Sequence, residues 1–209
     1  LQRPRSDWKW SLVRIYVRQG DKLSFAPWVN YPAQQFFPFI DPYGQFKHKD
    51  WPGKIHSDKD LQQAALTETF DLAQHPGPLD RSAYGGWLKG PRQEAKGHFY
   101  VKKIEGKWWM VDPEGYLFWS HGAVRVTSTC GITPLDGRDQ YFEHLPAVSG
   151  ESLSGFYKTR DELLYPYYQV RGIQRTYDFS GANLFRKYGK DWQKLFPNLI
   201  HQRFKSWGL

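Results

Sequence analysis

The segment 116–127 contains groups of apolar residues at consecutive positions. Residues 117–119 are Leu-Phe-Trp, and Ala123, Val124 and Val126 follow after a short break. A strand that covers one face of a sheet alternates apolar and polar side chains, whereas a strand buried on both faces does not. The pattern therefore predicts a strand over 116–127 whose second half is buried on both faces, as in a parallel sheet or a barrel interior.

The residues before this run indicate a β-meander. Strands are predicted over 98–104 and 107–112, with turns at Glu105-Gly106 and at 113–115, which is Pro-Glu-Gly. Asp112 and Glu114 are acidic residues of that second turn, and we interpret them as structural. Residues 128–178 have little periodicity and many turn residues, which predicts a long irregular loop with a short helix near 161–168.

Helical patterns return in the C-terminal part. Asp178 or Ser180 is expected to cap a helix that ends at Tyr188, and a second helix is expected over 191–207. Gly208 has the position of a glycine that follows a helix end. Hairpin, buried strand, long loop and helix, in this order, are how a (β/α)8 barrel begins. The expected fold class is therefore α/β, and 98–209 would hold the meander and the first βα unit of an incomplete barrel.

The N-terminal part predicts two further regions. Residues 8–31 contain two strand-like runs around a turn, and a lone hairpin cannot hide an apolar face, so 1–35 is expected to be the end of a β-domain. Residues 36–97 are the predicted linking segment. It begins with a proline-rich and aromatic stretch, within 32–56, that is expected to lie against a folded surface. A helix follows, begun by Ser57 and Asp60 and stopped near His75.

The composition of the chain excludes several kinds of site and partner. The chain has 209 residues, a net charge of +8, 18% aromatic residues and one cysteine, Cys130. A single cysteine excludes an internal disulfide framework and a cysteine-cluster metal site. The seven histidines show no metal-ligand pairing at helical spacing, and no nucleotide-binding or metalloprotease motif is present, so we expect no cofactor and no metal. No apolar run has membrane-spanning length, so no membrane partner is expected.

Several long motifs occur in one order through most of 36–209. They resemble the region before and at the start of the catalytic barrel in agarase-like enzymes of glycoside hydrolase family 50. The motifs are Phe-Ile-Asp-Pro-Tyr-Gly-Gln-Phe-Lys-His-Lys-Asp-Trp-Pro-Gly-Lys at 39–54, His-Pro-Gly-Pro at 75–78, Tyr-Gly-Gly-Trp at 84–87, Gly-Lys-Trp-Trp-Met-Val-Asp-Pro-Glu-Gly at 106–115, Phe-Trp-Ser-His-Gly at 118–122 and Ala-Asn-Leu-Phe-Arg-Lys-Tyr-Gly at 182–189.

The resemblance implies a carbohydrate-binding-like β-sandwich, ending in 1–35, followed by a barrel that cleaves β-linked galactans such as agarose or porphyran. It implies a retaining mechanism, in which two carboxylates lie about 5–5.5 Å apart. The two catalytic glutamates of the family have no counterpart in this sequence. A barrel takes about 250 residues, so we expect a fragment that is inactive alone and needs the remainder of the barrel, as a continuation or as a second chain. A polysaccharide substrate favours a secreted or periplasmic location.

Nine residues are candidates for substrate binding, for reasons of position. Some lie near the end of the barrel strand or in the loop after it, which opens on the active face of such barrels. Others lie in the most family-like motif, where aromatic side chains in loops can stack on sugars. They are Arg125, His121, Thr127, Asp136, Arg138, Tyr141, His48, Asp50 and Trp51.

Some of these candidates also have a structural interpretation. Arg125 could equally form an ion pair at the barrel rim, and His121 is more easily explained as a hydrogen-bonded core histidine. The alternative function for the whole chain is a non-catalytic carbohydrate-binding module. Nucleic-acid binding ranks last, because the basic residues are dispersed among 21 acidic ones.

Overall fold

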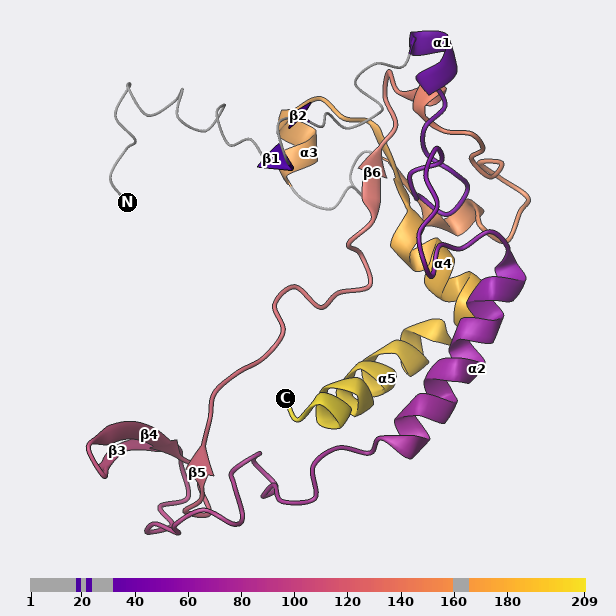
Figure 1. The fold of residues 1–209 in the computed structure, drawn as a ribbon. Helices are drawn as coiled ribbons and strands as arrows, with labels where there is room; N and C mark the ends of the chain where they lie inside the picture. Colours follow the sequence, from indigo (N-terminus) through magenta and orange to yellow (C-terminus); the bar gives the residue numbers. More distant parts are fainter. Residues whose placement is uncertain (1–17, 20–21, 24–31, 160–165) are drawn as a thin grey trace, which may run out of the picture.

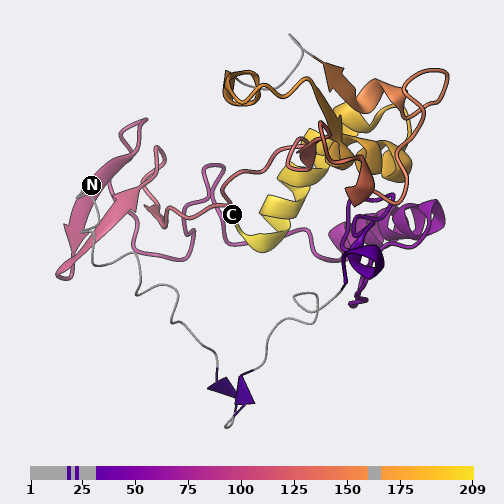
Figure 2. The ribbon, with the colours of Figure 1, turned by 90° about the horizontal axis from the view of Figure 1, so that it is seen from above.

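The computed structural model describes residues 18–19, 22–23, 32–159 and 166–209. Within them the chain forms a mixed α/β structure with two parts. Three helices and a small sheet make one part, and a β-meander makes the other (Figure 1). The view from above shows that two extended segments, one after α2 and one before β6, connect them (Figure 2).

The β-meander consists of β3 (Tyr100–Ile104), β4 (Lys107–Val111) and β5 (Leu117–Phe118), all antiparallel. Its first turn is the predicted one, with Glu105 and Gly106 both at positive φ. The loop over 80–97 packs beside the sheet, since Trp87 forms a β-bridge with Leu117. Strands β3 and β4 confirm the two strands that the sequence predicts over 98–104 and 107–112.

The prediction of a long strand over 116–127 is wrong for this structure. Only β5 is a strand, and residues 119–127 run as exposed coil, in which Trp119 is 67% and Val124 86% exposed. A strand needs a hydrogen-bonded neighbour, and within the described residues the stretch after β5 pairs with none. The burial inferred from its apolar sequence is absent for the same reason.

A second sheet lies in the segment that was expected to be irregular. It has the antiparallel order β6–β8–β7, formed by β6 (Ile132–Pro134), β8 (Arg175–Asp178) and β7 (Tyr157–Thr159). The connection holds two short 3₁₀ helices, η4 (Asp139–Tyr141) and η5 (Ser154–Phe156), and the helix α3 (Pro166–Val170). The expected helix near 161–168 falls partly outside the described residues, and α3 overlaps its end.

Three helices pack on one another next to this sheet, which α4 contacts, and their boundaries follow the predicted caps. They are α2 (Asp58–Gln74), α4 (Phe179–Tyr188) and α5 (Trp192–Trp207). Ser57 and Asp60 form a reciprocal capping box at the start of α2. Asp178 accepts a hydrogen bond from the Gly181 N–H at the start of α4, and Gly208 takes the left-handed conformation after α5. Helix α4 packs between the other two.

The hydrophobic core lies where the second sheet meets α4. Its buried members are Leu135, Phe142, Tyr177, Phe179 and Ala182. The proline-rich segment packs on this core, as expected: Ile40 forms a parallel bridge with Phe142. At Gly44 a Cβ would lie 2.8 Å from the Phe179 ring, and φ is +78°, so only glycine fits this approach.

The N-terminal region is described only at β1 (Arg18–Gln19) and β2 (Lys22–Leu23), which pair antiparallel, and at α1 (Ala33–Phe36). The pairing of β1 with β2 agrees with the predicted turn at 19–22. The other residues of the predicted hairpin lie outside the described residues. Among the described helices, none is both long and apolar enough to cross a membrane.

Candidate substrate-binding surface

Aromatic side chains from the end of α1 and the segment after it gather with a residue of η4. Adjacent ring centroids lie 4.9–6.4 Å apart, as in packed aromatic pairs. None of the rings is fully buried, so the group forms part of the surface. We call it the ring cluster; its members are Phe36, Phe37, Phe39, Phe46, His48 and Tyr141.

Two predicted site residues belong to the ring cluster. Tyr141 stacks on Phe37 with 5.3 Å between ring centroids and 13° between ring planes. The His48 ring lies beside Phe36 and Phe46, and its Nε2 is 2.7 Å from the Phe36 carbonyl oxygen. Both side chains are therefore held in fixed orientations by their neighbours.

Backbone contacts explain why η4 meets the proline-rich segment. The N–H groups of Phe39 and Ile40 both donate to the Tyr141 carbonyl, at 3.0 and 2.9 Å. The Lys47 ammonium forms an ion pair with the Glu143 carboxylate, 2.6 Å between Nζ and Oε1. Two segments almost a hundred residues apart in the sequence thus form one surface.

Asp50 and Trp51 lie in the loop that continues from this surface. The loop turns through Pro52 and Gly53, and the Lys54 N–H donates to the Trp51 carbonyl over 3.1 Å. Trp51 is 41% exposed, and the Lys54 ammonium lies 5.1 Å from its ring centroid. The structure therefore places His48 and Tyr141 in one cluster, and Asp50 and Trp51 lie in the loop that follows His48.

Asp136 has a structural role in this chain. Its carboxylate accepts hydrogen bonds from the backbone N–H groups of Gln174 and Arg175, both at 3.0 Å. Burial would raise the pKa of Asp136, but these hydrogen bonds and the Arg175 charge outweigh it and hold the pKa below its ordinary value. Asp136 therefore fixes the start of β8. Arg138 lies just before η4, where its carbonyl accepts from the Tyr141 N–H over 2.9 Å.

The remaining three candidates lie in the exposed coil after β5. His121 is exposed, with Nδ1 2.9 Å from the Trp119 carbonyl oxygen, so its interpretation as a core histidine is wrong. Arg125 is exposed and has φ of 61°. The Thr127 hydroxyl interacts locally with the Thr129 hydroxyl at 2.9 Å. These three residues do not come together because the strand expected to position them ends at Phe118.

Sequence reasoning missed a polar cluster behind the loop. The Tyr43 hydroxyl donates to the Asp58 carboxylate over 3.0 Å, and Arg186 approaches both residues, 3.5 Å from Asp58 and 5.0 Å from the Tyr43 ring centroid. Burial, and then the hydrogen bond to Asp58, raise the pKa of Tyr43 to about 12. Tyr43 and Arg186 lie in family-like motifs far apart in the sequence, and no local pattern connects them with Asp58.

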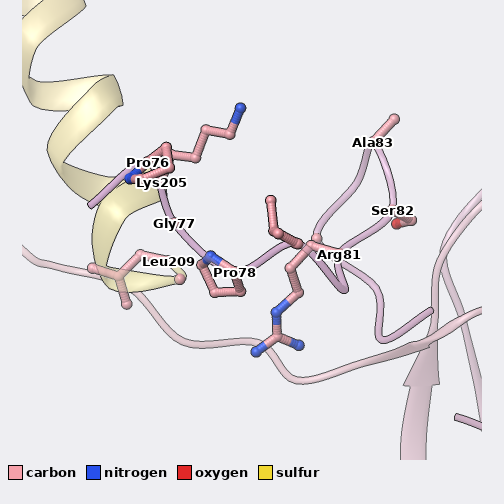
Figure 3. A pocket seen from close by; sticks show the side chains of 11 residues that line it. Pro76, Gly77, Pro78, Arg81, Ser82, Ala83, Lys205 and Leu209 are labelled. Carbon is pink, nitrogen blue, oxygen red and sulfur yellow. The ribbon is translucent and has the colours of Figure 1, made fainter. Parts of the chain in front are cut away.

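The molecule also has a cavity of about 580 Å³, between the segment after α2 and the end of α5 (Figure 3). Its lining is mostly proline, glycine and aliphatic, with two cations, Arg81 and Lys205. None of the nine predicted residues lines it. Among the described residues, no group of three or more His, Cys, Asp or Glu side chains is placed to hold a metal ion.

Comparisons with known proteins agree with one another. The chain is 30% identical over 227 aligned residues to beta-agarase B of Vibrio sp. (strain JT0107), an alignment that covers 100% of the chain and 23% of that protein. Among solved structures, the agarase AgWH50C matches with 31% identity and a TM-score of 0.72, over 90% of this chain and 27% of its own.

Two further structures give the same result. PfGH50B matches with 29% identity and a TM-score of 0.73, over 90% of this chain and 29% of its own. A structure described as an exo-beta-agarase matches with 29% identity and a TM-score of 0.67, over 90% of this chain and 30% of its own. No family model matches the chain. The chain thus spans between about a quarter and a third of the length of these relatives.

Proposed function

The chain is a relative of the agarases of glycoside hydrolase family 50, and on that basis we propose that it forms part of a β-galactan hydrolase. The observation that carries the proposal is the match over its whole length to beta-agarase B, together with the three similar structures. The substrate class is agarose or a porphyran-type galactan, and the mechanism is retaining. Such a hydrolase acts on an external polysaccharide, which favours a secreted or periplasmic location.

In this proposal the chain supplies a wall of the substrate cleft. The exposed ring of Trp51 stacks on a sugar, and His48, Asp50 and Tyr141 complete that wall. Sugars have apolar faces and hydroxyl edges, so an aromatic ring beside polar groups suits them. Arg138 lies at the edge of the same surface, whereas the position of Asp136 suits it to holding the loop rather than touching sugar.

The catalytic glutamates are proposed to lie outside this chain. Retaining hydrolysis needs one carboxylic acid to protonate the leaving oxygen and one free carboxylate to attack the anomeric carbon. The carboxylates near the ring cluster have other partners: Glu143 pairs with Lys47, and Asp41 accepts from the Tyr43 and Gln45 N–H groups. These contacts support a binding role for the surface rather than an acid–base role.

The apolar coil after β5 is proposed to become the first strand of a (β/α)8 barrel. Trp119, Val124 and Val126 are exposed, and large apolar side chains grouped on a surface are typical of a covered interface. The other barrel strands would cover them and would place Arg125 and Thr127 at the active face. Domains at 1–35, 36–97 and 98–209 follow from the same proposal.

The test compares this chain alone with a preparation that also contains the rest of the hydrolase. We expect residues 1–209 alone to release no reducing ends from an agaro-oligosaccharide. Co-expression with the missing barrel segment, or a chain that contains both, should restore hydrolysis with retained anomeric configuration, measured by NMR. Hydrolysis by residues 1–209 alone would contradict the proposal, and so would an inactive complete chain.

A further inference from the structure

The Lys54 side chain is unusual for a lysine in a surface loop, because only 5% of it is exposed. Its ammonium donates to the carbonyl oxygens of Lys47, over 3.1 Å, and Lys49, over 2.9 Å. It also lies 3.3 Å from the Asp50 carboxylate. An ammonium group has three N–H donors, and these three oxygens match them. Burial of this charge is therefore compensated within the loop itself.

The same ammonium lies over the Trp51 ring, 5.1 Å from its centroid. A cation in this position is attracted to the electron-rich ring face and restrains the ring. The contact thus fixes the ring against the loop, while 41% of Trp51 remains exposed to a ligand. One atom, Nζ of Lys54, thus contacts the loop backbone, the Asp50 carboxylate and the Trp51 ring.

The base of the loop is held by different contacts. The Gln45 side chain donates to the Ile55 carbonyl over 2.7 Å and accepts from the Ile55 N–H over 3.0 Å. It also donates to the Asp41 carboxylate over 2.8 Å. Loss of the Lys54 ammonium would therefore release the tip of the loop, which carries Trp51, and would leave its base in place.

We propose that Lys54 is a positioning residue, which holds the Trp51 ring in the orientation that stacks on a galactose unit. The inference rests on the proposed function, because it takes Trp51 as a sugar contact. Lys54 itself is covered and does not touch the substrate. Its contribution is to present a ring that is already oriented, so that little conformational freedom is lost when the sugar binds.

The test is a double-mutant cycle in the complete hydrolase that contains this chain, with a neutral agaro-oligosaccharide as substrate. Lys54→Met keeps most of the apolar stem and removes the charge. We expect it to raise KM by about tenfold, within the range that loss of a cation–π contact spans, with kcat little changed. Trp51→Ala should raise KM by at least as much. The double variant should be no worse than Trp51→Ala alone, because both changes remove the same interaction.

Lys49→Met is the matched control, since Lys49 is an exposed lysine of the same loop. It should keep the wild-type KM, and all variants should keep the wild-type melting temperature within a few degrees. A wild-type KM for Lys54→Met, or additive effects in the double variant, would overturn the role of Lys54. A wild-type KM for Trp51→Ala would also overturn the role of Lys54, but it would leave the proposed hydrolase function intact. A complete enzyme that does not act on galactans would instead refute the proposed function.

Discussion

Asp112 is the fully buried acidic residue that closes the turn between β4 and β5. Its carboxylate accepts hydrogen bonds from the N–H groups of Glu114, at 2.9 Å, and Tyr116, at 2.8 Å, and from the Ser82 hydroxyl. A Cβ on Gly86 would lie 2.2 Å from an Asp112 oxygen, so glycine is required there. One side chain thus joins the loop over 80–97 to the meander.

Asp112→Ala should destabilise the chain by about 2–3 kcal/mol, because it leaves several half-buried donors without an acceptor. Asp112→Asn keeps one acceptor oxygen for the two N–H groups, and its amide can donate to Ser82, so its loss should be clearly smaller. Urea unfolding followed by tryptophan fluorescence gives both values. Equal stability of the alanine variant and the wild type would show that water replaces the carboxylate.

Residue-level predictions from the sequence succeeded where the signal is local. Asp112 and Glu105 were assigned to turns from their neighbours, and the structure confirms both turns. Asp136 was a substrate-binding candidate because of its loop, but its partners are backbone groups 38 and 39 residues later. The buried lysine at position 54 gave no signal, since nothing in the sequence separates it from the exposed Lys49.

At the level of elements, an ion network joins the three long helices. Glu68 of α2 accepts hydrogen bonds from Lys187, over 3.0 Å, and Tyr188, both of α4. Arg203 of α5 lies 3.9 Å from Glu68 and donates to Asp71. Burial would raise the pKa of Glu68, but these hydrogen bonds and positive charges outweigh it and hold the pKa below its usual value.

The lowered pKa of Glu68 makes its contribution to stability dependent on pH. The unfolded chain binds the proton more readily than the folded one, so the contribution is present above the unfolded pKa of about 4.3 and is lost as pH falls through the folded pKa. Glu68→Gln should therefore cost about 1–2 kcal/mol near pH 7, in the range of partly exposed charged hydrogen bonds, and clearly less near pH 3.

Urea unfolding of wild type and Glu68→Gln at the two pH values measures this difference. Glu105→Gln is the control, because it makes the same charge change at an exposed turn and should show little difference at either pH. A cost of Glu68→Gln that is equal near pH 7 and pH 3 would contradict the assignment of the effect to ionised Glu68.

Elements were predictable from the sequence to different extents. The caps at Ser57, Asp178 and Gly208 are local signals, and α2, α4 and α5 begin and end where those caps predict. The β6–β8–β7 sheet was missed because its strands have only three or four residues each, and because β6 pairs with β8 across about forty residues. Strands this short have too few positions to show a period of two.

At the scale of the whole molecule, the net charge of +8 is not reflected at the proposed substrate surface. Three lysines lie near Trp51 and the ring cluster, and two of them have acidic partners: Lys47 pairs with Glu143, and Lys54 with Asp50. Lys49 is exposed in the same loop. A surface with paired charges and aromatic rings suits an uncharged sugar. Other segments also carry positive charge, and the lysines of 89–103 are one source.

Binding of a neutral agaro-oligosaccharide to the complete hydrolase should change less than about twofold between roughly 50 mM and roughly 500 mM NaCl, because the sugar carries no net charge whose attraction to the protein salt could screen. A sulfated galactan provides the contrast: any contribution of the basic loop over 89–103 should weaken its binding at the higher salt concentration. Isothermal titration calorimetry gives both affinities. A strongly salt-dependent affinity for the neutral sugar would refute the assignment of binding to the ring surface.

The mixed α/β class was predictable from the sequence, whereas the β-sandwich and the barrel stay predictions. The exposed coil after β5 shows where prediction from pattern stops: its sequence is that of a covered strand, but none of the described strands pairs with it.

That coil also has a consequence for biosynthesis. In a hydrolase translated from its N-terminus, residues 119–127 leave the ribosome before the strands proposed to cover them, and unpaired apolar segments associate readily with one another. The run is interrupted by His121, Gly122 and Arg125, which are polar or flexible residues of the kind that separate aggregation-prone stretches. The nascent polypeptide thus carries its own protection during the interval before the remaining strands emerge.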